Sequence, residues 1–360
     1  MALFSGSDTN NACIGVDIGS SGIKMVELKR DNKRVVLSTY GFSENLGGDN
    51  PLKAPIEDTA KMITKIWQES GMTSRQVVAS LPNFSVFSSI ITLVDVSEAN
   101  LPTAVNAEAR KVMPLPLEEM VLDWKKITGL VGQSTDGASH SADIKTGAKV
   151  ITKILLTGAP KVLVNKYVEI FKKAELNLVF LEGEIIALIR SLIGNDKGTI
   201  MLVEVGSTNS DLVIIDHGIP VFNRSLDLGG LVVTEAISKS LNIDLQQAEQ
   251  FKYDLGVAGI RSAELPEALK NLVDSVANEI KYSLNLFQSN NGKTVEKIVM
   301  TGGSSLLYNF PEYLAKELNV NIIIGSPWTL ISYPLNIKPL LDEIGPRLAV
   351  AVGLAMRGIS

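Results

Sequence analysis

The sequence lacks the residues from which disulfide scaffolds and zinc sites are built. Its 360 residues include one cysteine, Cys13, and two histidines, His140 and His217. A single thiol cannot form an internal disulfide, and it cannot supply a cysteine-rich zinc site. The two imidazoles lie in unrelated sequence contexts, so neither a histidine-based metal site nor a Ser-His-Asp triad is expected.

The sequence also has no excess of positive charge and no long hydrophobic run. The 34 Lys and Arg residues are outnumbered by 39 Asp and Glu residues, which argues against nucleic acid as the partner. No run of 18 or more uncharged apolar residues occurs, so no membrane-spanning helix is predicted. The N-terminus, MALFSGSDTNNA, has neither the basic start nor the apolar core of a signal peptide, and we expect a cytoplasmic location.

The chain is instead rich in short apolar segments. Hydrophobic residues make up 45% of it, which is enough for sizeable cores, and the length favours two or three domains. The mean hydropathy of +0.19 leaves room for an apolar partner surface. A Gly/Ser/Thr/Asp-rich stretch at 129–147 predicts a hairpin tip. Periodicity predicts strands at 14–18, 23–30, 33–42, 77–81, 86–94, 121–128, 149–158, 199–206, 211–216, 219–225, 297–301 and 321–324, and helices at 56–70, 99–113, 160–174, 185–192, 231–241, 245–255, 266–288, 306–317 and 346–357.

One pattern occurs twice, about half the chain apart. A strand that ends in an acid is followed by a Gly-Ser turn and a hairpin, first at 17–21 (DIGSS) and again at 204–208 (EVGST). Such a repeat predicts two homologous halves, each with its own sheet. Glycine lets the backbone approach a phosphate, and the amides of a tight turn can converge on an anion. A carboxylate at the strand end can hold Mg²⁺, usually through water. Two facing turns would clamp a polyphosphate.

A third segment, 299–306 (VMTGGSSL), follows the order strand, double glycine, helix. It can be read as an ordinary strand-to-helix turn. The functional interpretation is a backbone platform for a nucleoside, because two adjacent glycines allow a close approach.

In this order the three segments resemble the phosphate-1, phosphate-2 and adenosine motifs of the actin/Hsp70/sugar-kinase superfamily. Within it the chain is similar to the PilM family of type IV pilus assembly proteins, which is related to the division protein FtsA. The resemblance covers nearly the whole chain, and its most specific stretch is 108–124, with Pro114 and Pro116 before an acidic strand. One position departs from the pattern, because Glu204 stands where the superfamily usually has Asp. The resemblance therefore supports nucleotide binding more than hydrolysis.

The resemblance implies ATP or ADP with Mg²⁺ as cofactors, and it implies a set of site residues. Glu182 and Glu184 are weak catalytic candidates, since kinase relatives place a catalytic acid nearby. Glu249 and Lys252 share a helix face, which a surface ion pair would also explain. The implied phosphate residues are Gly19, Ser20, Ser21, Gly22, Lys24, Gly206, Ser207, Thr208 and Asn209; the adenosine residues are Gly229, Gly230, Glu249, Lys252, Gly302, Gly303, Ser304 and Ser305; and Asp17 and Glu204 would hold magnesium through water.

The implied fold is α/β and actin-like (ribonuclease H-like), with two duplicated halves around a nucleotide cleft. Subdomain 1A would comprise 1–83, 177–195 and the C-terminal helix 340–360, with subdomain 1C inserted at 84–176. Subdomain 2A would comprise 196–230 and 291–339, with subdomain 2B at 231–290.

The implied function is that of a cytoplasmic ATP-binding component of the type IV pilus inner-membrane platform, with at most slow ATP hydrolysis. A groove between subdomains 1A and 1C, whose residues the sequence does not identify, would take the N-terminal cytoplasmic tail of the membrane protein PilN. Other platform and motor proteins are expected partners, and contact with the inner face of the cytoplasmic membrane would be indirect, through PilN.

Two alternatives stay open. An FtsA-like filament-forming scaffold would anchor itself through a C-terminal amphipathic helix, whereas this sequence ends at Ser360, directly after its last predicted helix. A small-molecule kinase of the same superfamily needs a sugar pocket and a positioned base. The stretch at 108–124 argues against that kinase.

Overall fold

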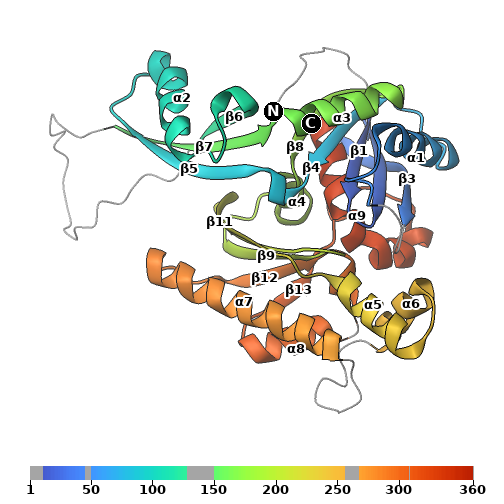
Figure 1. The fold of residues 1–360 in the computed structure, drawn as a ribbon. Coiled ribbons are helices and arrows are strands. Elements are labelled where there is room, and N and C mark those ends of the chain that lie inside the picture. Colours follow the sequence, from blue (N-terminus) through green and yellow to red (C-terminus); the bar gives the residue numbers. More distant parts are fainter. Residues whose placement is uncertain (1–10, 45–49, 128–149, 256–266, 308, 360) are drawn as a thin grey trace. The chain divides into compact units, whose positions relative to one another are not determined.

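The computed structural model describes residues 11–44, 50–127, 150–255, 267–307 and 309–359 (Figure 1). The chain divides into two compact units. The smaller unit covers 84–167, and the larger one consists of the flanking segments, 2–83 and 168–360. The predicted hairpin tip at 129–147, which includes His140, lies outside the described residues.

The first half of the larger unit is a five-stranded sheet with the order β3-β2-β1-β4-β8. β1, β2 and β3 form an antiparallel ladder, and β4 and β8 run parallel to β1. The bounds of these strands are β1 (Ala12–Gly19), β2 (Gly22–Asp31), β3 (Arg34–Glu44), β4 (Gln76–Leu81) and β8 (Asn177–Gly183).

The second half repeats this topology in the order β11-β10-β9-β12-β13. Again three antiparallel strands are extended by two parallel ones. The predicted duplication is therefore confirmed at the level of the sheets. The bounds are β9 (Thr199–Val205), β10 (Ser210–Asp216), β11 (Ile219–Leu226), β12 (Lys297–Thr301) and β13 (Ile322–Ile324).

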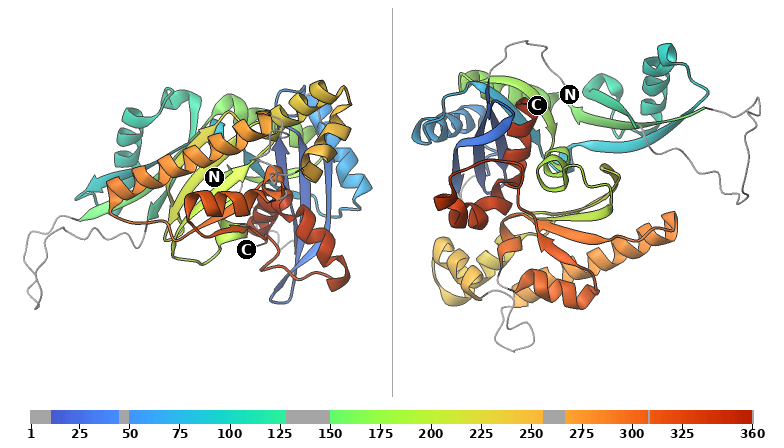
Figure 2. Two further views of the ribbon diagram at one scale, coloured as in Figure 1. Left: turned by 90° about the horizontal axis from the view of Figure 1, so that it is seen from below. Right: turned by 180° about the vertical axis from the view of Figure 1, so that it is seen from behind.

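The helix α9 (Lys338–Gly358) packs on β1, as Figures 1 and 2 both show. A Cβ on Gly15 would lie 1.9 Å from the carbonyl oxygen of Ala351, and one on Gly353 would lie 2.0 Å from that of Ala187 in α4 (Glu184–Leu188). Only glycine permits these approaches. The buried side chains of α9 and α4 join one hydrophobic core with side chains of both sheets.

Four helices form a second core on the other face of the second sheet. The longest of them is the helix predicted at 266–288, and its side chains Leu272, Val276 and Ile280 are fully buried in this core. The bounds of these helices are α5 (Gly230–Leu241), α6 (Leu245–Leu255), α7 (Glu267–Asn291) and α8 (Phe310–Leu318). In the first half, α1 (Ile56–Glu69) packs on β2 and β3, and α3 (Lys161–Lys173) connects β7 to β8.

The smaller unit is an antiparallel sheet in the order β5-β7-β6. Its strands are β5 (Phe87–Val94), β6 (Met120–Ile127) and β7 (Ile151–Pro160), and α2 (Leu101–Val112) packs against it. The core of this unit contains Ile91, Leu93, Leu101, Val105, Ala109, Ile154 and Leu156.

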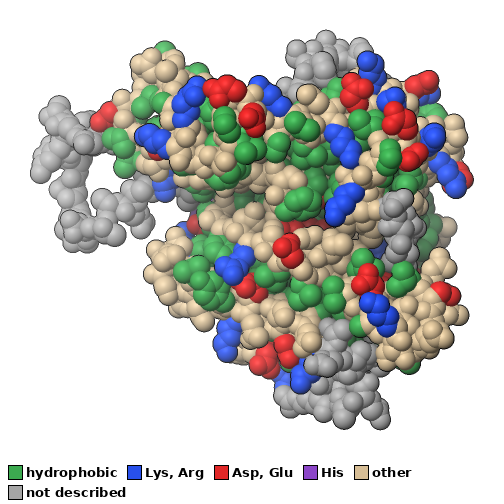
Figure 3. Space-filling model, in the orientation of Figure 1, with side chains coloured by type: hydrophobic (Ala, Val, Ile, Leu, Met, Phe, Trp, Pro, Cys, Tyr) green, Lys and Arg blue, Asp and Glu red, His purple; other side chains and the backbone are tan. Residues whose placement is uncertain are grey.

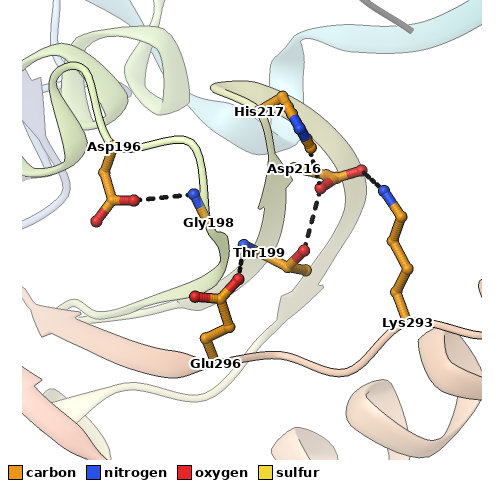
Figure 4. A network of polar contacts seen from close by, with 7 residues as sticks. All are labelled: Asp196, Gly198, Thr199, Asp216, His217, Lys293 and Glu296. Atoms are coloured by element: carbon orange, nitrogen blue, oxygen red, sulfur yellow. Dashed lines mark hydrogen bonds and ion pairs between the residues drawn. The ribbon is translucent and has the colours of Figure 1, made fainter. Parts of the chain in front are cut away.

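A polar network fixes one end of the second sheet (Figure 4). Asp216 is buried and accepts hydrogen bonds from the Thr199 hydroxyl (3.1 Å) and the Lys293 amine (2.7 Å), and its Oδ1 lies 3.0 Å from Nδ1 of His217. His217 and Gly218 both have positive φ, 54° and 78°, which makes a tight two-residue turn between the strands predicted at 211–216 and 219–225. Burial raises the pKa of Asp216, but the bonds from Lys293, His217 and Thr199 outweigh it and hold the pKa below its ordinary value.

Two further observations concern the molecule as a whole. No helix within the described ranges is both long enough and apolar enough to cross a lipid bilayer. On the face drawn in Figure 3, Lys and Arg side chains are interspersed with Asp and Glu side chains, in keeping with the near balance of the two totals in the sequence.

Candidate functional site

A pocket in the larger unit is lined by residues of both halves. Its walls come from β2, β3 and α9 on one side and from β9, α5, α6 and the turn after β12 on the other. Twelve predicted site residues line it: Ser21, Gly22, Lys24, Glu204, Gly206, Ser207, Gly230, Glu249, Lys252, Gly302, Gly303 and Ser304. The sequence reading missed the other residues of the lining, which are Phe42, Ser43, Leu231, Tyr253, Ile344, Arg347 and Leu348.

The other predicted residues are not among those that line the pocket, although several contact residues that do. They are Asp17, Gly19, Ser20, Thr208, Asn209, Gly229 and Ser305, together with the two catalytic candidates, Glu182 and Glu184. A Cβ on Gly229 would lie 2.4 Å from the carbonyl oxygen of Ser207. The Ser305 hydroxyl donates to the carbonyl oxygen of Gly302 at 2.7 Å.

The two Gly-Ser turns meet. The hydroxyl oxygens of Ser20 and Thr208 lie 2.9 Å apart, and the Thr208 hydroxyl is 2.7 Å from Oδ1 of Asn209. The start of α5 also holds the second turn in place, because the amides of Gly230 and Leu231 donate to the carbonyl oxygens of Gly206 (3.0 Å) and Ser207 (2.8 Å). The fold therefore brings together the two copies of the repeat, which stand about half the chain apart.

Acidic side chains surround one amine beside these turns. Asp17 is buried, and its carboxylate accepts hydrogen bonds from the Lys24 amine and the Ser80 hydroxyl, both at 3.2 Å. Burial lowers the pKa of Lys24, but Asp17 and then Glu204 and Glu184 outweigh it, so this pKa lies above its ordinary value. The amine is therefore held in its charged form.

Burial raises the pKa of Glu204 to about 8, and the charges of Asp211 and Asp17 add to the effect while Lys24 opposes it. Burial also raises the pKa of Glu184 well above its usual range, with Asp17 and Glu204 contributing. The charges of Asp17 and Asp211 thus act on both Glu184 and Glu204. Among the described residues, no three acidic, histidine or cysteine side chains are grouped so that they could hold a metal ion directly.

Asp211 was not among the predicted site residues, although the repeat contains a signal for it. Lys24 stands opposite Asp17 on the β1–β2 ladder, and Asp211 stands opposite Glu204 on the β9–β10 ladder. Asp211 is therefore the counterpart of Lys24 in the second half. It lies three residues beyond the end of the second repeat (204–208), as Lys24 lies three residues beyond the end of the first (17–21).

The two catalytic candidates have different surroundings. Glu182 forms a two-point ion pair with Arg190, with N–O distances of 2.5 and 3.0 Å, and Arg190 also donates to the carbonyl oxygen of Gly353. Glu184 accepts a hydrogen bond from the amide of Asn83 at 2.8 Å, and the charges of Asp17 and Glu204 help to raise its pKa. Of the two candidates, Glu184 is the one that these acids beside the Gly-Ser turns influence.

The Lys252 side chain is buried, with 2% of its surface exposed, so its pair with Glu249 does not lie on the surface. Its amine donates to Glu249 (2.6 Å), the Thr234 hydroxyl (2.9 Å) and the carbonyl oxygen of Gly230 (3.2 Å). Burial lowers the pKa of Lys252, and the charge of Glu249 opposes this effect. A Cβ on Gly230 would lie 2.3 Å from the Ser304 hydroxyl and 3.0 Å from the Lys252 amine, so a larger residue would displace both side chains.

Comparison with known proteins assigns the family. The family model described as type IV pilus assembly protein PilM matches residues 15–359. The chain belongs to the PilM family. The resemblance seen in the sequence is thereby confirmed, and the actin-like fold with it.

A solved PilM-PilN type IV pilus biogenesis complex contains a chain that is 25% identical to this one, with a TM-score of 0.80 over 97% of this chain and 98% of that chain. Cell division protein FtsA of Bacillus subtilis (strain 168) is 22% identical over 268 residues, which are 70% of this chain and 59% of FtsA. MreB 5 of Spiroplasma citri, solved bound to AMPPNP, is 13% identical with a TM-score of 0.51 over 96% of both chains, and it shows the shared fold alone.

Proposed function

We propose that this chain is the nucleotide-binding assembly protein of a type IV pilus platform. ATP or ADP would occupy the pocket between the two halves, and the N-terminal cytoplasmic tail of a PilN-type membrane protein would bind at a separate groove. Membership of the PilM family and the likeness to the chain in the PilM-PilN complex support this proposal. The nucleotide bound to the MreB 5 relative adds to it at the level of the fold.

The meeting of the two Gly-Ser turns is the observation that carries the nucleotide proposal. Ser21, Gly22 and Lys24 from the first turn and Gly206 and Ser207 from the second line the same pocket. A Cβ on Gly19 would lie 3.2 Å from the Lys24 amine, so the missing side chain keeps this amine accessible to an anion. Hydroxyls, turn amides and an amine are the donors that a polyphosphate needs.

The charges of the site also fit the magnesium ion that the family resemblance implies. Burial and neighbouring charges raise the pKa of Glu184 and Glu204, so these acids hold protons that a divalent cation would displace. A nucleoside triphosphate would bring further negative charge for the cation to neutralise. Asp17 and Glu204 are the residues that would hold a hydrated Mg²⁺, which supplies charge neutralisation for the phosphates. Lys24 would hold the phosphates from the first turn, and Glu184 remains the candidate for orienting a water if slow hydrolysis occurs.

For the partner, we propose a groove between subdomains 1A and 1C, with 1C at 84–176 and 1A formed by 1–83, 177–195 and 340–360. Subdomains 2A (196–230 and 291–339) and 2B (231–290) would complete the second half. An extended apolar tail can bind through strand pairing and side-chain pockets. The chain would then act at the inner face of the cytoplasmic membrane, held there by its partner, and would link that partner to the pilus motor.

Calorimetry on the full chain tests both parts. ATP and ADP should bind in the presence of Mg²⁺, and a synthetic peptide copying the N-terminal tail of the PilN protein from the same source should bind with a Kd of micromolar order. If titration with the peptide gave no heat of binding, either with or without ATP, the proposed partner would be wrong. ATP-dependent sedimentation of filaments would favour an FtsA-like scaffold instead, and an ATP-dependent product from a panel of sugars would favour a kinase.

A further inference from the structure

One wall of the pocket is formed by three residues from three separate elements. Tyr253 of α6 donates its hydroxyl hydrogen to the carbonyl oxygen of Gly303 at 3.1 Å, which fixes the ring. The guanidinium carbon of Arg347 in α9 lies 5.3 Å from the centroid of this ring. All three residues line the pocket. The Arg347 guanidinium and the Tyr253 ring thus lie next to each other, beside Gly303 of the double glycine.

The backbone of α9 holds Arg347 at this place. The carbonyl oxygen of Pro346 accepts a hydrogen bond from the Thr301 hydroxyl (3.0 Å) and another from the Gly302 amide (3.2 Å). The helix is thereby bound to the turn that carries Gly303. A Cβ built on Gly303 would lie 3.4 Å from the Tyr253 hydroxyl and 3.9 Å from Nε of Arg347, so both side chains flank the glycine.

The surroundings of Arg347 suit a flat aromatic ligand better than a phosphate. Ile344 and Leu348, its neighbours on α9, also line the pocket and supply apolar surface. The amine beside the two phosphate turns belongs to another residue, Lys24. A guanidinium is planar and weakly hydrated, so it can lie flat on an aromatic face, whereas a lysine ammonium interacts with such a face as a point charge.

We propose that Arg347 recognises the base of the bound nucleotide by stacking its guanidinium on the face of a purine. This proposal rests on the proposed function, because it concerns the same pocket. Tyr253 acts as the positioning residue, because the Arg347 guanidinium lies over its ring and its hydroxyl holds the ring by a hydrogen bond to Gly303. Lys24 and the Gly-Ser turns hold the phosphates, so base and phosphates are recognised by separate groups.

The test compares ATP with inorganic tripolyphosphate as probes, by calorimetry in the presence of Mg²⁺. We expect Arg347→Ala to weaken ATP binding about tenfold, as loss of a stacking contact does, and to leave tripolyphosphate binding within about twofold. Arg347→Lys keeps the charge but loses the planar group, so its ATP affinity should stay close to that of the alanine variant. The matched control is Arg357→Ala on the same helix. Arg357 stacks on Phe180 (4.9 Å to the ring centroid) and does not line the pocket, so ATP affinity should be unchanged.

The outcomes distinguish base recognition by Arg347 from nucleotide binding by the chain as a whole. Equal weakening of ATP and tripolyphosphate would assign Arg347 to the phosphates and overturn the proposal. Unchanged ATP affinity in Arg347→Ala, or full rescue by Arg347→Lys, would also overturn it. Retained tripolyphosphate binding shows that the variants are folded. If the parent chain binds neither probe, the nucleotide function itself is wrong.

Discussion

Nδ2 of Asn83 lies 2.5 Å from Oδ1 of Asp211, although the two residues are 128 positions apart in the sequence. Asn83 lies two residues after the end of β4 in the first half, and Asp211 lies on β10 in the second half. The same amide group also contacts Asn223 and Ser225 on β11. One side chain therefore ties the two halves together while its backbone amide binds Glu184.

Replacing Asn83 with Ala should destabilise the larger unit. Asp211 would keep only the Ser225 hydroxyl from this network, and its pKa is already raised by burial, with the bonds from Ser225 and Asn83 opposing that rise. Loss of a buried hydrogen-bond partner costs about 1–3 kcal/mol in the free energy of unfolding. Denaturant unfolding measures the change. Asn100→Ala is the matched control, because that exposed side chain does not cap its helix. Equal stabilities of the two variants would contradict the prediction.

The stability of the protein should fall between pH 4.5 and 8 because of Glu204. Its pKa is raised from 4.5 to about 8, so the folded chain keeps a proton that the unfolded chain releases in this window. The contribution is favourable below the window and is lost as the pH rises through it. Glu204→Gln mimics the protonated acid. The variant should match the parent near pH 4.5 and exceed it at pH 9 by more than about 1 kcal/mol. If the stabilities of the variant and the parent fell equally as the pH rises, the titration of Glu204 would not be the cause.

The same substitution tests the magnesium role separately. If Glu204 holds the hydrated ion, Glu204→Gln should reduce the gain in ATP affinity that Mg²⁺ gives over EDTA, because a neutral amide attracts a divalent cation less. Calorimetric titrations with ATP in Mg²⁺ and in EDTA measure this ratio for the variant and the parent. Identical ratios would show that Glu204 has no part in binding the metal.

The network at the end of the second sheet should be worth more than a surface ion pair. Asp216→Asn removes the charge that Lys293 and His217 face, and we expect a loss of about 1–3 kcal/mol at pH 7. Because the pKa of Asp216 is lowered, this contribution is present above its ordinary value of 3.8 and is lost as the pH falls through the folded value. The difference between variant and parent should therefore shrink in acid. Asp342→Asn, which breaks the exposed pair with Lys338, should cost less than about 1 kcal/mol.

The sequence predicted most of the sheet strands and both Gly-Ser turns, because alternating apolar patterns and turn residues are local signals. It did not predict β8 at Asn177–Gly183, a short apolar segment with no hairpin partner next to it in the chain. Its partner is β4, whose pairing depends on tertiary structure. The helix predicted to start at Pro346 begins at Lys338, so Pro346 lies inside α9, where it cannot donate a hydrogen bond to the preceding turn.

The site shows the same division between local and distant signals. The glycines and acids of the repeats were identified because their order carries the information. Arg347, Tyr253 and Asn83 stand in segments with no motif of their own, and they reach their places only because α9, α6 and the end of β4 converge. The spacing of residues within a motif does not reveal which distant helices pack beside that motif in the folded chain.

The close packing of α9 on β1 has a consequence for how the protein is made. The strand β1 emerges from the ribosome some three hundred residues before the helix that covers it, Lys338–Gly358. Until then one apolar face of the first sheet stays open to water or to a chaperone. The first half is therefore expected to complete its folding last, at a rate limited by one of the longest loop closures in the chain.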